Sequence, residues 1–241
     1  MLDEGEGRRH TREQPERIKL LSQVDVLEAL APRQIESLAH TTWERSIQSG
    51  EMVYLQGEAP GPLLLLLKGR IRLYATVAGQ EFTFEVLQAG TIFGESSLTG
   101  GPCPEYAQAL EPALVGVLSL NAFWQLLREN PEVNERVMKL VVNRSCTYRN
   151  RMMDIALKEV SARLASLILD LIQSEGVVTR EGYYRINPRY THEQLATMVG
   201  AKRVAVTRAF GALQEVGGLR LESRYIYVVD LSALKQLAAG R

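Results

Sequence analysis

An unbroken helical pattern from Pro131 to about Leu157 constrains the fold of this chain more than any other feature. The segment contains no glycine, and its one proline stands at the first position, where a helix tolerates it. A helix of about 27 residues would be about 40 Å long, which exceeds what one small domain can cover. Its apolar stripe has two open interpretations, the core of its own domain or, favoured here, a dimer interface with a second copy. The residues of this stripe are Val137, Val141, Tyr148, Met152 and Ile155.

The segment before this helix has a different pattern. Residues 1–18 are polar and lack an apolar period, which predicts a mobile tail, and residues 20–40 predict two short helices separated at Pro32. Between residues 41 and 118, short apolar stretches alternate with glycine-containing turns, which predicts a closed or sandwiched β structure. These stretches are Met52–Leu55, Leu63–Leu67, Ile71–Ala75, Phe82–Val86 and Leu114–Leu118.

Residues 158–241 predict a compact α+β unit that contains a helix-turn-helix. Thr191 and Gln194 have the spacing of a capping box, and Gly200 suits the positive φ of a tight turn. Val206, Phe210 and Leu213 form the inner face of a second helix. Its opposite face carries the predicted DNA-binding residues, which are Lys202, Arg203, Val204, Thr207 and Arg208.

Arginine suits this position because its planar fork can donate two hydrogen bonds to guanine in the major groove. Val204 can pack against a thymine methyl group. The alternating segment 220–229 predicts a wing, with Arg220, Arg224 and Tyr225 free to contact phosphates.

The composition excludes several other classes of protein. The 28 basic and 28 acidic residues cancel, so a nucleic-acid site must be a local patch. No apolar run approaches the roughly 20 residues of a membrane helix, and no hydrophobic signal core follows Met1, so we expect a cytoplasmic protein without a membrane partner. Three scattered histidines and two cysteines predict no metal site and no cofactor, and Cys103 is expected to be an unreactive loop residue rather than a redox thiol.

Several short motifs occur in an order that resembles the CRP/FNR family of bacterial transcription regulators. They are Gly57-Glu58, Lys68-Gly69, Gly90-Thr91-Ile92-Phe93-Gly94-Glu95, the long helix and the helix-turn-helix. The resemblance covers roughly residues 20–235. It implies an α+β protein with a cyclic-nucleotide-binding-type β-roll, a dimerisation helix and a C-terminal winged helix-turn-helix. We expect a tail at 1–18, the roll at 19–130, the dimerisation helix at 131–157 and the winged helix at 158–241.

The same resemblance implies a homodimer that acts on promoter DNA and commonly recruits RNA polymerase as an activator. The segment Arg203–Arg208 is similar to the cyanobacterial nitrogen-regulator branch, whereas the catabolite activator carries glutamate at the position of Val204. A GTA-like half-site therefore fits this chain better than TGTGA.

The predicted effector pocket departs from the pattern of cyclic-nucleotide-responsive members. Gly94 and Glu95 match the family, but Glu105, followed by Tyr106, replaces the arginine that binds the phosphate. A carboxylate there would repel cyclic AMP, cyclic GMP or 2-oxoglutarate. We expect Glu105 to form an ion pair with Arg144 or Arg149, either within one chain or across the dimer. The alternative is that these charged groups are solvated on neighbouring surfaces. The full predicted pocket is Phe93, Gly94, Glu95, Glu105, Tyr106, Arg144 and Arg149.

Other functions remain as alternatives. One is a regulator gated by an unidentified small-molecule effector, and another is a cyclic-nucleotide sensor module that does not bind DNA. No motif typical of an enzyme is present, so catalysis is not expected.

Overall fold

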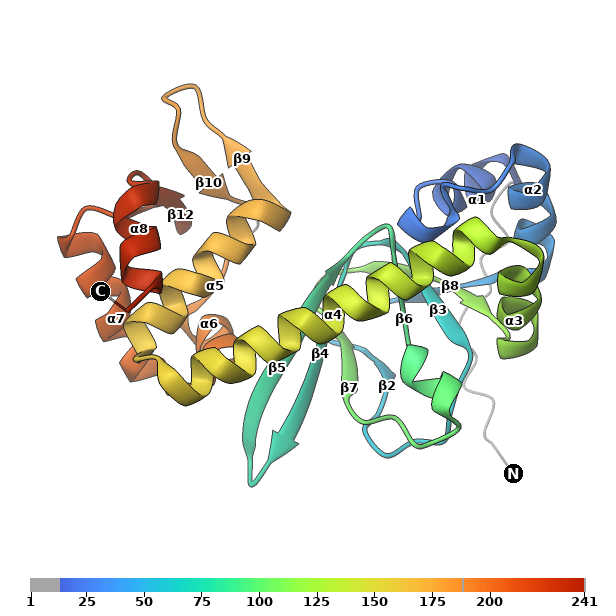
Figure 1. Cartoon of the computed structure of the whole chain (residues 1–241), viewed down its shortest axis with the longest axis horizontal. Coiled ribbons are helices and arrows are strands. Elements are labelled where there is room, and N and C mark those ends of the chain that lie inside the picture. Colours follow the sequence, from blue (N-terminus) through green and yellow to red (C-terminus); the bar gives the residue numbers. More distant parts are fainter. Residues whose placement is uncertain (1–13, 188, 241) are drawn as a thin grey trace. The chain divides into compact units, whose positions relative to one another are not determined.

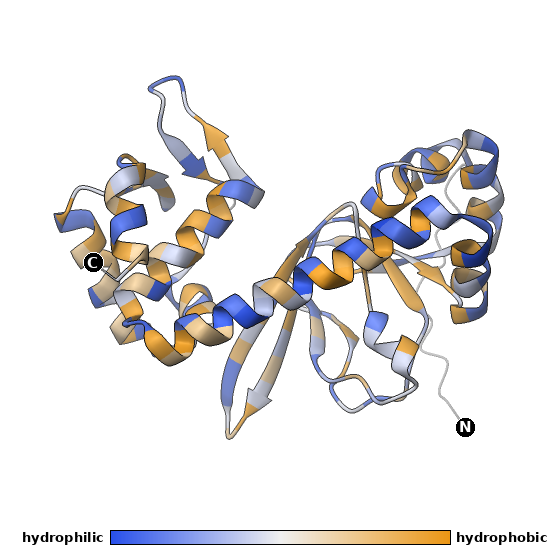
Figure 2. Ribbon diagram, viewed as in Figure 1, coloured by the Kyte–Doolittle hydropathy of each residue, from blue (hydrophilic) through white to orange (hydrophobic). Residues whose placement is uncertain are grey.

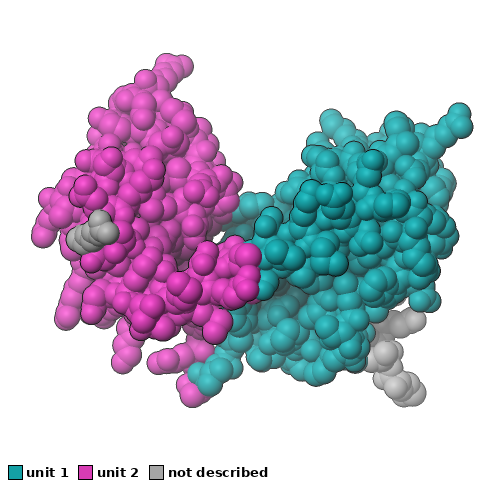
Figure 3. Space-filling model, in the orientation of Figure 1, with its two compact units in different colours: residues 1–77, 84–145 teal, residues 78–83, 146–241 magenta. Residues whose placement is uncertain are grey.

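The computed structural model describes residues 14–187 and 189–240 (Figure 1). The α+β fold class is as predicted, with helices and antiparallel sheets in both parts of the chain. The chain forms two compact units, one comprising residues up to 77 with 84–145 and the other 78–83 with 146–241 (Figure 3). Their boundary falls inside α4 (Pro131–Leu157), whereas the sequence placed the domain limits at the two ends of that helix.

The N-terminal unit begins with helices that cover one side of its core. They are α1 (Gln14–Leu21), the short 3-10 helix η1 (Asp25–Leu27), α2 (Pro32–Thr41) and, later in the chain, α3 (Leu120–Glu129). Residues 14–18 were predicted to belong to a mobile tail, and this is wrong because α1 buries Leu20 and Leu21. The Arg17 guanidinium also lies 3.2 Å from the Glu44 carboxylate. The rest of the predicted tail lies outside the described residues.

Two four-stranded antiparallel sheets form the roll. One has the order β1-β8-β3-β6 and the other β2-β7-β4-β5. The first comprises β1 (Trp43–Ile47), β8 (Ala113–Leu118), β3 (Leu63–Lys68) and β6 (Thr91–Phe93); the second comprises β2 (Met52–Tyr54), β7 (Tyr106–Ala109), β4 (Arg70–Val77) and β5 (Gln80–Gln88). A second 3-10 helix, η2 (Glu95–Thr99), follows β6.

The five consecutive leucines of β3 are all buried because both faces of this strand are covered. Leu63, Leu65 and Leu67 pack in the cluster that includes the helices, and Leu64 and Leu66 pack in the cluster inside the roll. Successive side chains of a strand point to opposite faces, so an unbroken apolar run is what a strand between two cores requires. Strands β1, β6 and β7 were not predicted, since they are short or mix polar and apolar residues.

The C-terminal unit packs helices against a four-stranded antiparallel sheet of order β11-β12-β10-β9. The helices are α5 (Val160–Glu175), α6 (His192–Val199), α7 (Arg203–Glu215) and α8 (Leu231–Ala238); the strands are β9 (Gly176–Val178), β10 (Tyr184–Ile186), β11 (Leu219–Glu222) and β12 (Tyr225–Val228). Apolar residues of α5, including Leu164 and Ile168, are fully buried in this unit. The hairpin β9–β10 was not predicted. Within the described part of the chain, no helix has the length and apolarity needed to span a membrane.

Candidate DNA interface and effector-type site

The first helix of the predicted helix-turn-helix is fixed at both ends. At its start, Thr191 Oγ1 accepts a hydrogen bond from the Gln194 amide (3.1 Å), and Gln194 Oε1 accepts one from the Thr191 amide (2.8 Å). This is the predicted capping box. At its end, Gly200 adopts a φ of 63°, the left-handed conformation that a residue without a Cβ reaches most readily. Both local predictions are confirmed.

The second helix, α7, separates an apolar face from a basic face. Val206, Phe210 and Leu213 are buried in the unit. The predicted DNA-binding residues of this helix are all exposed, namely Lys202, Arg203, Val204, Thr207 and Arg208. Lys202 is the N-cap residue, and the start of a helix carries partial positive charge from its free amide groups. The exposed edge of α7 therefore has the charge and the donors that a DNA phosphate or a guanine edge requires.

Thr207 connects the two helices of the motif. Its Oγ1 donates to the Arg203 carbonyl oxygen (3.0 Å) and lies 3.0 Å from Nδ1 of His192, the first residue of α6. The His192 ring also packs near Phe210, with 5.2 Å between ring centroids. Thr207 thus positions α7 as well as facing solvent, and the sequence had placed His192 only in the capping turn.

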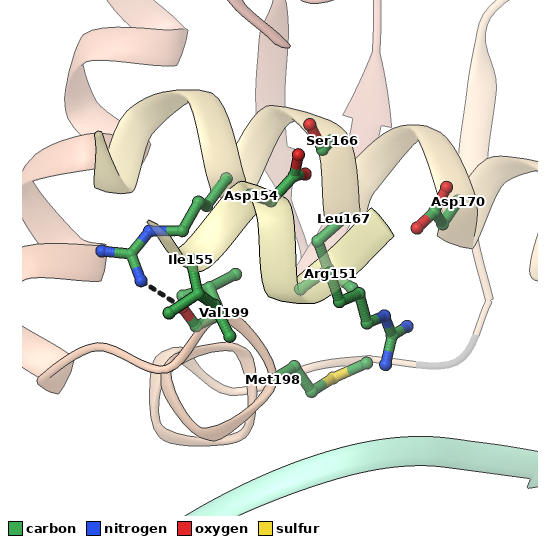
Figure 4. A pocket seen from close by; sticks show the side chains of 9 residues that line it. Arg151, Asp154, Ile155, Ser166, Leu167, Asp170, Met198 and Val199 are labelled. Atoms are coloured by element: carbon green, nitrogen blue, oxygen red, sulfur yellow. Dashed lines mark hydrogen bonds between the residues drawn. The ribbon is translucent and has the colours of Figure 1, made fainter. Parts of the chain in front are cut away.

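Arg163 of α5 supports the turn from behind. Its Nη1 donates to the carbonyl oxygen of Val199 at 2.9 Å and approaches that of Gly200 at 3.4 Å. The dashed line in Figure 4 marks the Val199 bond, beside a small pocket that is also lined by Asp154 and Asp170. The last carbonyls of a helix lack partners inside the helix, so a guanidinium there satisfies them and complements the helix dipole. Sequence reasoning missed this residue because one arginine in an amphipathic helix carries no distinctive signal.

Replacing Arg163 with leucine is expected to lower the free energy of unfolding of the C-terminal unit by roughly 1–3 kcal/mol, the range for hydrogen bonds to a charged group. Chemical denaturation followed by far-ultraviolet circular dichroism measures this change. Arg180→Leu, at an exposed loop residue, is the control and should have little effect. Equal stability of the Arg163 variant and the wild type would contradict the supporting role.

The predicted wing is the hairpin of β11 and β12. Ser223 and Arg224 have φ values of 51° and 66°, which fit a two-residue turn with positive φ at both positions. Arg224 is exposed at this turn, as its predicted phosphate contact requires. Arg220 is not free as predicted, because its Nη2 lies 3.3 Å from Glu222 Oε2.

Tyr225, also predicted to contact phosphate, has its ring face covered within the protein, and the phosphate contact of its hydroxyl stays a prediction. The guanidinium groups of Arg185 and Arg189 lie over its ring, 4.9 and 4.6 Å from the centroid. Such stacking satisfies the face of the aromatic ring within the protein.

Charge is divided unevenly along a chain that is neutral as a whole. Residues 158–241 carry twelve basic and eight acidic side chains, whereas residues 1–157 carry 16 basic and 20 acidic ones. The positive excess lies in the segment that contains the helix-turn-helix. A net positive charge in this segment favours nucleic-acid binding.

Arg144 is the centre of the predicted effector pocket, where α4 approaches the roll. Its side chain is only 9% exposed, and its Nη1 and Nε lie 2.6 Å from Glu95 and 3.3 Å from Glu85. Its Nη2 donates to the carbonyl oxygen of Ile92 at 2.9 Å and to the hydroxyl of Thr91 at 3.3 Å. Glu85 was not predicted, because the alternation of its strand assigns it to a face but not to a partner.

Three other residues of the predicted pocket, Phe93, Gly94 and Tyr106, have structural roles within the N-terminal unit. Phe93 is fully buried in the roll core, and Gly94 has a φ of 79° at the start of η2. The Tyr106 ring stacks on Tyr74, with 5.1 Å between centroids.

Glu105 has a different partner from the one predicted. Its Oε1 accepts a hydrogen bond from the Tyr54 hydroxyl at 3.0 Å, and Nη2 of Arg149 donates to Cys146 Sγ at 3.0 Å. Within one chain, the hydrogen bond of Glu105 therefore goes to a tyrosine and not to an arginine. A pair across two subunits stays a prediction. Burial raises the pKa of the Glu105 carboxyl, and the nearby Glu95 raises it further, while Tyr54 and Arg144 oppose the shift.

Replacing Glu105 with glutamine is expected to raise the melting temperature at pH 8 and to change it little at pH 4. A folded-state pKa above the unfolded value means that ionising Glu105 costs stability as the pH rises, and glutamine avoids this cost while still accepting from Tyr54. Calorimetry between pH 4 and pH 8 measures the difference, with the exposed Glu36→Gln as the control. A Glu105 variant that is less stable at every pH would contradict the argument.

The exposed face of α4 includes four of the five residues of the predicted dimer stripe, at least in part. Val137 is buried, and it packs in its own core with Phe123 and Leu126, so its assignment to a dimer interface is wrong. Met138, the next residue along the helix, is 60% exposed and was not part of the predicted stripe. Apolar residues recur along α4 (Figure 2), and the predicted residues Val141, Met152 and Ile155 are exposed while Tyr148 is partly so. The helical period identifies a stripe but cannot tell which edge faces the core of its own unit.

The described residues contain no group of three or more histidine, cysteine or acidic side chains placed to hold a metal ion.

Comparison with known proteins assigns both parts of the chain. Residues 44–130 match the cyclic nucleotide-binding domain, and residues 162–237 match the Crp-like helix-turn-helix domain. The chain is 24% identical to a CRP-like cAMP-activated global transcriptional regulator of Mycobacterium tuberculosis, over 91% of this chain and 99% of that protein. It is 27% identical to the global nitrogen regulator of a Nostoc species, over 81% and 89%.

A solved structure supports the fold. The structure of a CooA mutant from Carboxydothermus hydrogenoformans covers 90% of this chain and 95% of its own, with a TM-score of 0.77 and 20% sequence identity. Since the roll, the long helix and the capped helix-turn-helix occur here in one chain, and both domain families are matched, the chain joins a cyclic nucleotide-binding domain to a Crp-like helix-turn-helix domain, the domain pair of the CRP/FNR-type transcription regulators that it resembles.

Proposed function

We propose that this chain is a homodimeric regulator that binds two-fold symmetric promoter DNA through α7. The observation that carries the proposal is the exposed edge of α7, where Arg203 and Arg208 face solvent while Val206 and Phe210 anchor the helix. The exposed apolar side chains of α4, with Met138 and Met152 more than half exposed, supply a face that a second copy would cover. The half-sites would lie about one helical turn, ~34 Å, apart.

We further propose that DNA binding needs no cyclic nucleotide. The Arg144 guanidinium is already bonded to Glu85 and Glu95, so it is not available to an incoming phosphate. Glu105 adds a carboxylate where an anionic effector would need a cation. The internal bonds of Arg144 would then hold α4 against the roll in place of an effector.

Operator binding by the ligand-free protein tests this proposal. The DNA used is an operator obtained by selection from random sequences. Fluorescence anisotropy with this operator is expected to give nanomolar affinity that changes less than twofold on adding cyclic AMP, cyclic GMP or 2-oxoglutarate. A protein that fails to bind until one of these compounds is added would refute effector-independent binding. Failure on every DNA fragment would refute the DNA-binding function itself.

The predicted sequence preference is a GTA-like half-site. Arg203 and Arg208 can each donate to guanine O6 and N7, whereas Val204 can only pack against a thymine methyl. Selection from random DNA, followed by sequencing, is expected to enrich palindromes with GTA-like arms. Enrichment of TGTGA arms would contradict this assignment.

Promoter DNA and RNA polymerase are the proposed partners, because sequence-specific binding of this kind acts where transcription starts. The chromosomal DNA of a bacterium lies in the cytoplasm, so the proposed site of action is the cytoplasm. Gel filtration with light scattering is expected to show two copies of the chain per particle.

A further inference from the structure

The N-terminal unit contains a cavity of about 260 Å³ that lies apart from the predicted effector pocket. Its described lining residues come from β1, β2, β3, β8, η2 and the loops that precede β3 and β7, and none of them belongs to α4. Gly94 is the one residue it shares with the predicted effector pocket. The cavity is therefore not accounted for by the site at Arg144.

The cavity lies between the two sheets of the roll, and most of its wall is apolar. Leu64, Val115 and Val117 are buried on one side, and Val53 and Tyr54 of β2 contribute from the other sheet. An apolar cavity of about 150 Å³ can hold a benzene molecule, so the larger volume here accommodates one or two rings. A space bounded by two facing sheets favours a flat molecule.

The charged side chains of the described lining already form hydrogen bonds within the protein. Arg45 donates to the carbonyl oxygen of Val53 at 3.1 Å and to the Glu51 carboxylate at 3.3 Å. Glu58 accepts from the Leu55 amide at 3.0 Å. Arg45, the cationic residue of the described lining, is thus engaged by Glu51, so an anionic ligand would meet no free counter-charge there and its desolvation would not be compensated.

The electrostatic surroundings disfavour anions in particular. Burial raises the pKa of the Cys103 thiol, and the carboxylates of Glu105 and Glu58 raise it further. Cys103 lines the cavity, so the same carboxylates would act against a negatively charged ligand there.

Two hydroxyl groups give the cavity polar anchors. Ser97 Oγ accepts a hydrogen bond from the Gly61 amide at 3.1 Å, and its own hydrogen can still be donated. The Tyr54 hydroxyl donates to Glu105 at 3.0 Å, and its oxygen can accept a further hydrogen bond. A few polar groups in an apolar wall are typical of small-molecule sites.

We propose that this cavity binds one neutral, planar aromatic molecule of one or two rings that carries a single hydroxyl or N–H group. Its ring system lies between the valines of β8 and the side chains of β2, and its polar group bonds to Tyr54 or Ser97. This binding site goes beyond the proposed DNA-binding function and does not depend on it. Tyr54 lines the cavity and also donates a hydrogen bond to Glu105. A molecule in the cavity therefore contacts the tyrosine that bonds to Glu105, the residue that replaces the phosphate-binding arginine.

Methyl-labelled full-length protein, without DNA, tests the proposal by nuclear magnetic resonance. Phenol and indole are the probes, and benzoate is the anionic comparison. Saturable shifts are expected at the methyl groups of Leu64, Val115 and Val117, with dissociation constants of about 0.1–1 mM for ligands of this size. Val228 in the C-terminal unit is the internal control. No shift, equal shifts at Val228, or equally tight binding of benzoate would each overturn the proposal.

Matched variants test the location independently. Ala59 lines the cavity and is exposed, so Ala59→Trp should fill the space and weaken phenol binding at least tenfold, whereas Ala239→Trp at another exposed alanine should leave it unchanged. Ser97→Ala should weaken binding by about fivefold if Ser97 donates to the ligand. Binding that is the same in both tryptophan variants would overturn the assignment. If Ala59→Trp fails to fold, the methyl shifts of the wild type decide the question.

Discussion

Replacing Arg208 with alanine is expected to reduce the sequence discrimination of this protein strongly while leaving its binding to random DNA nearly unchanged. Each bidentate contact to a guanine contributes roughly 1–3 kcal/mol of discrimination, and a dimer makes the contact in both half-sites. The ratio of operator to random-DNA affinity should therefore fall by roughly 30-fold or more. Arg208 is exposed on α7 and lies away from the buried stripe, so its removal should leave the fold intact. Anisotropy titrations on operator and on scrambled DNA measure the ratio.

Lys202→Ala is the matched control, since Lys202 is exposed at the N-cap of the same helix. A phosphate contact carries no sequence information, so this variant should weaken both DNAs equally and reduce the salt slope by about 1 per lost contact. If Arg208→Ala and Lys202→Ala lower both affinities by the same factor, the division between reading and positioning is wrong.

The helix-turn-helix could be predicted from the sequence because its determinants are local. The bond between Thr191 and Gln194 spans three residues, and the positive φ of the turn follows from the conformational freedom of Gly200. The buried stripe on α7 follows the helical period. Local features of this kind predict the same structure whatever the tertiary contacts are. The long helix α4 is a further example, since its start follows from Pro131 and its end from the helical pattern, which stops at Leu157.

The polar contacts that complete the sites could not be predicted in this way. Arg144 is 49 residues from Glu95, and Tyr54 is 51 residues from Glu105, so each pairing depends on how the roll brings distant strands together. The sequence showed that Glu105 stands where related proteins carry an arginine, but it did not show that Glu105 would bond to Tyr54. The assignment of Val137 was wrong for a related reason, since its burial depends on an apolar cluster that joins residues far apart in the sequence.

The largest expected effect on stability is that of Arg144→Met, which should lower the free energy of unfolding of the N-terminal unit by about 2–4 kcal/mol. Removing one member of a buried ion pair leaves the others without a counter-charge, and Glu85 and Glu95 retain only 29% and 26% side-chain exposure. Both tryptophans, Trp43 and Trp124, lie in this unit, so their fluorescence during chemical denaturation reports its unfolding.

Two further variants separate the loss of a buried pair from a general effect of substituting α4. Lys139 forms an exposed pair with Glu135, and Lys139→Met should cost less than about 0.5 kcal/mol. The triple variant that combines Arg144→Met with Glu85→Gln and Glu95→Gln should recover more than half of the loss, because no buried charge is then left unpaired. If the triple variant is less stable than Arg144→Met, the packing of the arginine stem rather than charge compensation holds α4 to the roll, and the argument that Arg144 takes the place of an effector loses its physical basis.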